Sequence, residues 1–306
     1  MIRSDSLEGQ VLQNAWLTIG IFDGVHLGHR ALITRLVEGA HEDSSPAVVL
    51  TFHPHPAVIL GGNREFKHLA TVGERAALLE QLGVDVVITQ RFDLSFADQT
   101  AGQFMGRLTD TLGLRHLVIG YDTALGRGRE GDAAHLTRLG ERFGYTVEIV
   151  EPVHSAAGII SSRTIRALIQ EGAVDQASHL LGYSYPISGM VVHGDGRGRH
   201  INIPTANINY PEEKVMPANG IYATWAWVEG ERLRGATNIG INPTFTPDKK
   251  IASLETHLLD FDRDLYGQEL KLEFVSRLRE ERKFQSVEAL VRQIELDIIQ
   301  TRSILK

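Results

Sequence analysis

The segment Thr18-Ile19-Gly20-Ile21-Phe22-Asp23-Gly24-Val25-His26-Leu27-Gly28-His29 decides the fold of the first half of this chain. Its apolar start predicts a strand, its glycines predict a tight turn, and apolar residues at helical spacing from Leu32 to Ala40 predict a helix. The turn therefore brings Gly28 and His29 to the N-terminus of that helix. Free backbone N–H groups and the helix dipole favour a phosphate at this position.

The two histidines of this segment strengthen the phosphate interpretation. His26 and His29 are three residues apart, which places both side chains on one face of the first helical turn. Either imidazole can donate a hydrogen bond to charge that develops on a phosphate during transfer. The segment therefore predicts phosphate chemistry.

Apolar runs and helical patterns alternate through the first half of the chain. The predicted strands are Trp16–Phe22, Ala47–Phe52, Asp85–Thr89, His116–Gly120 and Thr146–Val150. The predicted helices between them are His29–Ala40, Gly73–Leu82, Ala101–Leu112 and Asp132–Phe143. This alternation predicts a doubly wound, Rossmann-like α/β domain with a parallel sheet. Ligands of such folds bind beyond the carboxyl ends of the strands, so the groups that follow strand ends should meet at one site. They are His26, His53, Asp122 and the loop Gly126–Gly131.

The pattern changes beyond Ser162. Two short helical stretches, Thr164–Glu171 and Val174–Leu181, lead to a predicted domain boundary after Ser184. Strands then follow one another without helices, and they are Ile187–His193, Tyr222–Val228, Leu233–Asn238, Ser253–Asp260 and Leu270–Leu278. Such a run predicts an antiparallel β-barrel. An apolar stripe from Val287 to Ile298 predicts a final helix packed against that barrel.

The overall composition limits the class of protein. The 306 residues exceed the length at which a single core usually stops growing, so two domains are expected. A formal net charge of -7 disfavours a nucleic-acid-binding surface, and the absence of cysteine excludes disulfides and thiolate metal ligands. The first residues lack the apolar core of a secretory signal, and no stretch is apolar and long enough to span a membrane. We therefore expect a cytoplasmic protein.

Other polar segments of the first half also follow predicted strands. His53 and His55 lie in a proline-stiffened loop, where no regular spacing with cysteine or carboxylate partners supports a zinc site. The segment Gly120–Asp132 combines glycines with two arginines, one of them Arg127, which can approach a phosphate. A structural loop and a solvated glycine turn are the respective alternatives.

A helix start with hydroxyl groups follows the last strand of this half. Ser161 and Ser162 can cap free N–H groups and can also contact phosphate, and Arg166 comes one turn later. An ordinary helix N-cap is the alternative interpretation of this segment.

The second half has its own glycine-rich basic segment, Val192–Arg199. It is followed by Pro204-Thr205-Ala206-Asn207. The glycines let the backbone approach a ligand closely, while the Thr205 hydroxyl and the Asn207 amide oxygen suit Mg²⁺ and ATP phosphates. A simple turn is the alternative interpretation of this short motif.

The motifs of the first half together resemble a known superfamily. Gly20-x-Phe22-Asp23-Gly24-x-His26-x-Gly28-His29 is similar to the signature of nucleotidyltransferases, whose histidine pair binds ATP phosphates in the transition state. Thr51–Pro56 is similar to an element of bacterial flavin adenylyltransferases, and Ser161–Arg166 to a superfamily element whose arginine binds ATP phosphates. The resemblance implies catalytic roles for His26, His29 and Arg166. It implies nucleotide or flavin contacts for Gly20, Phe22, Asp23, Gly24, Gly28, His53, His55, Asp122, Arg127, Ser161 and Ser162.

The motifs of the second half come in the order found in riboflavin kinases. Besides Pro204–Asn207 they are Gly240-x-x-Pro243-Thr244-Phe245, Glu255–Phe261, Leu265–Gly267 and Leu278–Phe284. The resemblance implies that Glu255 is the catalytic base and that Thr205 and Asn207 hold Mg²⁺ with the ATP phosphates. It implies nucleotide or flavin contacts for Gly194, Gly196, Arg197, Gly198 and Arg279.

Both halves together resemble the prokaryotic bifunctional riboflavin kinase and FMN adenylyltransferase family, also called FAD synthetases. The resemblance implies a nucleotidyltransferase domain over 1–184 and a riboflavin kinase barrel with a terminal helix over 185–306. It implies that ATP phosphorylates riboflavin to FMN and then adenylylates FMN to FAD with release of pyrophosphate. Riboflavin, FMN and ATP would be the small-molecule partners, and Mg²⁺ the cofactor.

Departures from the family pattern keep alternatives open. Thr123–Leu125 stands where the family usually has two aromatic residues, and Arg163 occupies a usual Ser or Thr position. One alternative is therefore a riboflavin kinase with a degenerate adenylyltransferase domain, and another is a non-catalytic flavin-binding carrier or sensor. A nicotinamide oxidoreductase is disfavoured because no G-x-G-x-x-G with a ribose-binding acid follows the first strand.

Overall fold

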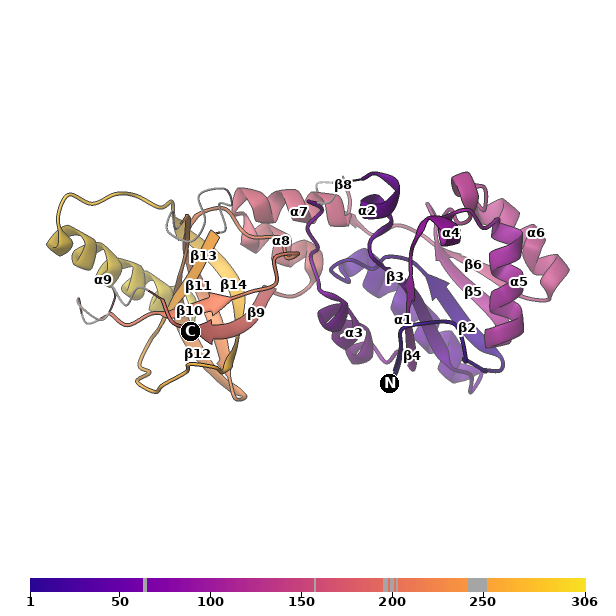
Figure 1. The fold of residues 1–306 in the computed structure, drawn as a ribbon, viewed down its shortest axis with the longest axis horizontal. Coiled ribbons are helices and arrows are strands. Elements are labelled where there is room, and N and C mark those ends of the chain that lie inside the picture. The colour runs from indigo at the N-terminus through magenta and orange to yellow at the C-terminus, as the bar shows by residue number, and fades with distance from the viewer. Residues whose placement is uncertain (63–64, 157, 195–197, 199–200, 202, 242–251) are drawn as a thin grey trace. The chain divides into compact units, whose positions relative to one another are not determined.

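The structure is a computed structural model that describes residues 1–306 except 63–64, 157, 195–197, 199–200, 202 and 242–251 (Figure 1). By its internal contacts the chain divides into two compact units, Met1–Ser162 and Arg163–Lys306. Each unit contains one large sheet, and the two sheets differ in kind.

The first unit is built around a parallel sheet. Its strands are β1 (Ile2–Ser4), β2 (Ala15–Ile19), β3 (Ala47–His53), β4 (Val86–Arg91), β5 (Leu114–Gly120) and β6 (Thr146–Val150). Their order across the sheet is β1-β4-β3-β2-β5-β6, and every neighbouring pair runs parallel. The order reverses at β2, which lies between β3 and β5. Ligands of doubly wound folds bind beyond the carboxyl ends of the strands at such a reversal.

Helices cover this sheet on both faces. They are α1 (Leu27–Glu42), α2 (Pro56–Leu60), α3 (Val72–Gln81), α4 (Leu94–Ala97), α5 (Ala101–Leu112) and α6 (Ala133–Phe143). Local capping signals explain where several of them begin and end. Thr71 and Thr100 form complete capping boxes at the starts of α3 and α5, while Gly113 and Gly144 end α5 and α6 in the left-handed conformation.

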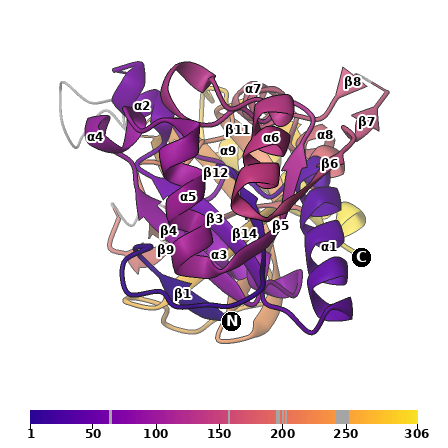
Figure 2. The same cartoon turned by 90° about the vertical axis from the view of Figure 1, so that its right-hand side faces the viewer.

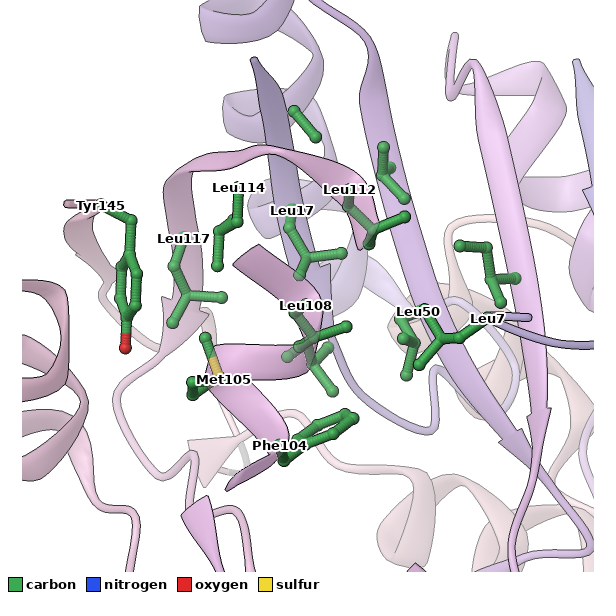
Figure 3. Packing of buried hydrophobic residues seen from close by; sticks show 14 of the residues in the cluster. Leu7, Leu17, Leu50, Phe104, Met105, Leu108, Leu112, Leu114, Leu117 and Tyr145 are labelled. Carbon is green, nitrogen blue, oxygen red and sulfur yellow. The ribbon is translucent and has the colours of Figure 1, made fainter. Parts of the chain in front are cut away.

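The strands bury side chains alternately into two apolar clusters. Leu17 and Leu50 contribute to the cluster that contains α5 and α6, whereas Trp16 and Val49 contribute to the cluster that contains α1 and α3. Figure 3 shows the first cluster, with Leu108 of α5 beside strand residues of the sheet. Figure 2 shows α1, α5 and α6 around the strands of this unit. A parallel sheet covered on both faces confirms the predicted Rossmann-like fold.

The second unit contains a closed antiparallel barrel. Its strands are β9 (Tyr185–Val192), β10 (Ala206–Asn209), β11 (Gly220–Val228), β12 (Glu231–Ile241), β13 (Ala252–Leu258) and β14 (Glu269–Arg279). The order around the barrel is β10-β13-β12-β11-β14-β9, and β9 also pairs with β10 to close it. The helix α9 (Val287–Ile304), yellow in Figure 1, contacts β11, β12 and β14. This arrangement confirms the predicted barrel with a terminal helix.

Two helices precede the barrel and pack within the same unit. The helix α7 (Ser162–Glu171) is followed by α8 (Val174–Leu181), which contacts β9 and β14. Gly172 between them has no room for a side chain, because a Cβ would lie 2.9 Å from Arg277 Cδ and 3.0 Å from the Tyr222 hydroxyl. The division between the two compact units falls after Ser162, the first residue of α7, and the domain boundary after Ser184 stays a prediction.

Some short elements were not predicted from the sequence. They are β1, β10, the small helices α2 and α4, and the two-stranded sheet of β7 (His154–Ser155) and β8 (Gly158–Ile159). The predicted strand Trp16–Phe22 extends too far, because β2 ends at Ile19 and Phe22 already has a φ of 51° in the following turn. Among the residues that the structure describes, no helix combines the length and hydropathy needed to cross a bilayer.

Candidate active sites

The histidine pair lies at the N-terminus of α1, as the sequence predicts. His26 is the N-cap residue, and its Nδ1 accepts a hydrogen bond from the backbone N–H of His29 at 3.3 Å. The two imidazole rings are stacked, with centroids 3.6 Å apart and planes inclined by 16°. His26 therefore has two roles, because it caps the helix and fixes the position of the second ring.

Burial keeps both histidines neutral near pH 7. It lowers the pKa of His26 to about 4, although the nearby Asp23 carboxylate acts in the opposite direction. Burial also lowers the pKa of His29 well below its usual value, and electrostatic interactions with His26 and with the Arg75 guanidinium act in the same direction. Because Nδ1 of His26 accepts a hydrogen bond, the proton of the neutral ring is on Nε2. His26 thus presents an N–H donor without a net charge.

The turn before α1 is shaped by close packing around Phe22. The Phe22 ring meets the His29 ring edge to face at 5.3 Å, and it lies over Gly20 so closely that a Cβ there would be 2.9 Å from the ring. Gly24 has a φ of +79°, a conformation that other residues rarely adopt. A Cβ on Gly28 would lie 3.2 Å from the His26 ring. These glycines are therefore required by the local packing of the histidine pair.

Asp23 holds the turn against its surroundings. Its Oδ1 accepts hydrogen bonds from the backbone N–H groups of Leu69 and Ala70 at 2.9 and 3.1 Å. Its carbonyl oxygen accepts a hydrogen bond from the Ser162 hydroxyl at 2.9 Å. Asp23 and Ser162 thus connect three separate segments of the chain, and both have structural roles at this end of the sheet.

Arg75 of α3 is a residue that the sequence analysis missed. Its guanidinium is buried and donates hydrogen bonds to the carbonyl oxygens of Ile21 at 2.9 Å and Phe52 at 3.4 Å. Burial lowers its pKa from the usual value, while the Asp23 carboxylate acts in the opposite direction. Arg75 therefore joins the turn after β2 to the end of β3 and places a positive charge near His29. No repeat or motif identifies it, because an arginine in a predicted helix is usually a surface residue.

The other predicted residues of the first unit lie in loops that leave the same edge of the sheet. His53 is exposed at the end of β3, and His55 is the N-cap of α2, where its ring lies 4.1 Å from that of Phe66. Asp122 is exposed after β5. The described parts of the chain contain no group of three or more His, Cys, Asp or Glu residues that could hold a metal ion.

The glycine loop after β5 has a structural explanation of its own. A Cβ on Gly126 would lie 2.5 Å from the backbone nitrogen of Ala101, and a Cβ on Gly131 would lie 2.7 Å from Ala101 Cβ. Arg127 forms an exposed ion pair with Asp98 at 3.5 Å. The glycines thus allow the loop to pack on the start of α5. Ser161 is half-buried in the first unit, and Arg166 belongs to α7 of the second.

In the barrel, the strand register brings the predicted kinase residues together. Glu255 on β13 is opposite Asn207 on β10, and Thr205 precedes β10 by one residue. The Thr205 hydroxyl donates a hydrogen bond to Glu255 Oε2 at 3.4 Å. Asn238 on β12 is opposite Glu255 from the other side. Directly opposed residues share one face of a sheet, so Asn207, Glu255 and Asn238 form a row across three strands. We call these three residues the β13 row.

Glycines accommodate this site as well. A Cβ on Gly194 would lie 2.3 Å from Asn207 Nδ2 and 2.6 Å from its Oδ1, so the amide of Asn207 occupies that space. A Cβ on Gly198 would lie 2.3 Å from the carbonyl oxygen of Ile203. The predicted residues Gly196 and Arg197 and the motif Pro243–Phe245 lie outside the described residues.

A pocket of about 890 Å³ opens beside Thr205. Its lining includes Pro204, Thr205, Thr256, His257, Asp260 and Tyr266. His257 Nδ1 forms a hydrogen bond with the carbonyl oxygen of Pro204 at 2.8 Å, which attaches this motif to β13. The Tyr266 ring lies 3.8 Å from the ring of His193. The pocket has the concave form and mixed lining expected of a small-molecule site.

Arg279 is placed differently from the rest of the predicted kinase residues. Its guanidinium forms hydrogen bonds with both carboxylate oxygens of the buried Asp297 on α9, at 2.7 to 3.1 Å. This contact connects the end of β14 to the terminal helix. Such a two-pronged arginine–carboxylate pair is geometrically specific and orders both partners.

Comparisons with known proteins assign the chain to a family. The sequence model described as FAD synthetase matches residues 9–164, and the one described as riboflavin kinase matches residues 181–305. The bifunctional riboflavin kinase/FMN adenylyltransferase of Listeria monocytogenes is 39% identical over 95% of this chain and 92% of its own length. The chain belongs to this family. The member from Escherichia coli K12 is 37% identical over 94% of this chain and 91% of its own length.

A solved structure supports the fold of this family member over nearly the whole chain. A crystal structure from Streptococcus pneumoniae, titled a macrolide-efflux protein, is 33% identical and has a TM-score of 0.91. It covers 98% of both chains. The family assignment rests on the matched sequence models and on the named bifunctional relatives, which agree with the order of the two sheets along the chain.

Proposed function

We propose that this chain makes FAD in two ATP-dependent steps. The barrel transfers the γ-phosphoryl group of ATP to the terminal ribityl hydroxyl of riboflavin and gives FMN and ADP. The parallel-sheet domain then transfers AMP from a second ATP to FMN and gives FAD and pyrophosphate. We assign the kinase activity to residues 185–306 and the adenylyltransferase activity to residues 1–184, and we place the protein in the cytoplasm.

The β13 row carries the kinase part of this proposal. Glu255 is held on a strand between Asn207 and Asn238, with the Thr205 hydroxyl 3.4 Å from its carboxylate. A carboxylate in this rigid position can accept the proton of a hydroxyl that attacks a phosphoryl group. Phosphoryl transfer otherwise depends on alignment of the two substrates, and the pocket beside Thr205 offers space for one of them.

The donor set beside Glu255 fits Mg²⁺. The Thr205 hydroxyl, the Asn207 amide and the Glu255 carboxylate all offer oxygen, which hard cations prefer. Gly194 leaves the space that the Asn207 amide occupies. Thr205 and Asn207 would hold the ion, which would neutralise charge on the ATP phosphates. Thr205 and Asn207 position the phosphates, and Glu255 accepts the proton.

The adenylyl transfer needs less proton chemistry. An FMN phosphate is already an anion, so the site has mainly to align it with ATP and to stabilise charge on the leaving pyrophosphate. His26 and His29 can donate neutral N–H groups beside the N-terminus of α1. We propose that Arg166 adds a positive charge, and that the loops containing His53, His55, Asp122 and Arg127 contact the nucleotide or the flavin.

The decisive experiment separates the two steps in one protein. Purified chain is incubated with riboflavin and Mg-ATP, and FMN and FAD are separated by chromatography. The wild type is expected to form both. Glu255→Gln should lower FMN formation by at least about 10²-fold, because it removes the proton acceptor and keeps its size.

A built-in control accompanies this variant. When FMN is supplied directly, Glu255→Gln should form FAD at close to the wild-type rate, since the parallel-sheet domain does not use Glu255. A wild type that forms neither product would refute the proposed function. A folded Glu255→Gln protein that still phosphorylates riboflavin at a rate within about threefold of wild type would refute the role of Glu255. Such a rate corresponds to a change of under about 1 kcal/mol in the activation free energy of the kinase step.

A further inference from the structure

Asn238 is a member of the β13 row that the sequence motifs do not single out. It is opposite Glu255 on β12, as Asn207 is on β10, so the two amides flank the carboxylate. The side chain is half-buried, and its Oδ1 is fully buried. Within the described part of the chain, this oxygen accepts no hydrogen bond. A buried acceptor without a donor destabilises the fold, so such a position calls for a ligand.

The surroundings determine which end of the Asn238 amide faces which way. Both Asn238 Nδ2 and Glu281 Oε1 lie close to Gly240. A Cβ built on this glycine would be 3.4 Å from Asn238 Nδ2 and 2.9 Å from Glu281 Oε1. The amide nitrogen is thus on the side of the Glu281 carboxylate, where an N–H group is electrostatically favoured. The Oδ1 atom is therefore the end of the amide that can accept a hydrogen bond from a bound ligand.

The substrate of the proposed kinase step offers suitable donors. The ribityl chain of riboflavin carries a hydroxyl on each of the three successive carbons that precede its terminal CH₂OH group. If Glu255 takes the proton of the terminal hydroxyl, a neighbouring hydroxyl of the same chain comes within reach of the next side chain in the row. We propose that Asn238 Oδ1 accepts a hydrogen bond from such a neighbouring hydroxyl and makes the kinase specific for polyhydroxylated acceptors. This inference rests on the proposed kinase function.

The test compares two acceptors. One is riboflavin, and the other is a flavin whose side chain is 5-hydroxypentyl, which keeps only the terminal hydroxyl. Asn238→Ala should lower kcat/KM for riboflavin by roughly tenfold or more, because a substrate hydroxyl loses its acceptor. It should change kcat/KM for the hydroxypentyl flavin by less than about threefold. A merely structural role would lower both values equally.

A second variant keeps the inference testable if the alanine protein folds poorly. Asn238→Asp retains an oxygen acceptor, so it should still prefer riboflavin over the hydroxypentyl flavin. Asn209→Ala, on the exposed surface of β10, is the matched control and should leave both acceptors unaffected.

Several outcomes would overturn the inference. Loss of preference for riboflavin in Asn238→Asp, or an equal loss for both acceptors in Asn238→Ala, would remove the hydroxyl contact. A higher Mg²⁺ requirement in Asn238→Ala with unchanged acceptor preference would make Asn238 a metal ligand instead. If wild type and Glu255→Gln phosphorylate riboflavin equally, the proposed base is wrong, which is a distinct result.

Discussion

The two candidate sites of this chain differ in how they are assembled. At the parallel sheet, a short contiguous segment provides the turn, the helix N-terminus and the neutral histidine pair. In the barrel, Thr205, Asn207, Asn238 and Glu255 come from distant parts of the chain and meet only through strand register. The first arrangement offers uncharged N–H donors, and the second offers oxygen acceptors and a carboxylate.

This difference matches the two chemical tasks. Adenylyl transfer to an existing phosphate anion needs donors for developing negative charge, and it needs no strong base. Transfer to a neutral hydroxyl needs a proton acceptor at a fixed position. Changes at the histidine pair should therefore affect only FAD formation, whereas changes around the β13 row should affect only FMN formation.

The largest expected effect concerns His29. His29→Ala removes a donor beside the N-terminus of α1 and should lower FAD formation from supplied FMN by about 10²- to 10³-fold. Phosphorylation of riboflavin should stay at the wild-type rate. Steady-state kinetics on each substrate, with folding checked by circular dichroism, measure both. His41→Ala at the far, exposed end of the same helix is the matched control. Equal loss of both activities in folded His29→Ala would contradict the separation of the sites.

The next effect concerns the glycine beneath Asn207. In Gly194→Ala the new methyl group would meet the Asn207 amide at 2.3 to 2.6 Å, so the amide must move. A displacement of about 1 Å at a reacting centre can cost about 10²-fold, and FMN formation should fall accordingly. FAD formation from supplied FMN should not change. Gly73→Ala in α3, where a Cβ would have no neighbour within 4 Å, tests whether alanine itself is tolerated. Unchanged kinase activity in Gly194→Ala would show that the position of Asn207 is unimportant.

The smallest effect concerns the stability of the histidine site at acidic pH. The pKa of His26 is about 4 in the folded chain, whereas its ordinary value of 6.5 applies to the unfolded chain. As the pH falls, the unfolded chain therefore binds this proton before the folded chain does. The stabilising contribution of His26 is therefore complete above about pH 6.5 and declines towards pH 4. Between about pH 7.5 and pH 5 the loss should be about 2 kcal/mol in the free energy of unfolding.

A cap-preserving substitution isolates this titration. Asn is also a favoured N-cap residue, so His26→Asn should keep the start of α1 and remove the titrating group. Urea denaturation at both pH values should then show a smaller decrease in the free energy of unfolding than in the wild type. The same pH dependence in His26→Asn and wild type would mean that His26 does not contribute to it.

Local sequence patterns predicted much of the fold because local physics determines it. The helices Ala101–Leu112 and Val174–Leu181 and the strand Thr146–Val150 have the predicted bounds, since their caps and periodicities lie within the segment. The strand β10 was not predicted, and a simple turn was the alternative interpretation of the motif that contains it. This segment is short and borders a glycine-rich segment, and only its pairing with β9 and β13 makes it a strand.

The candidate site residues were anticipated in part. The histidine pair, Thr205, Asn207 and Glu255 were singled out as candidates from the sequence, and their roles stay predictions. Arg75 and Asn238 were not singled out, because each is an ordinary residue in its own segment. Arg75 matters only through the carbonyl oxygens it reaches, and Asn238 only through the strand next to it.

The sequence by itself therefore determined the fold class, the order of the two domains and the chemical groups available for phosphate transfer. Turn residues, helix caps and apolar periodicity act over a few neighbouring residues, so they can be recognised without coordinates. Only the tertiary structure decided that the histidines are neutral and that Glu255 lies between two amides. Burial changes a pKa through atoms from several segments, and strand register depends on how the whole barrel closes.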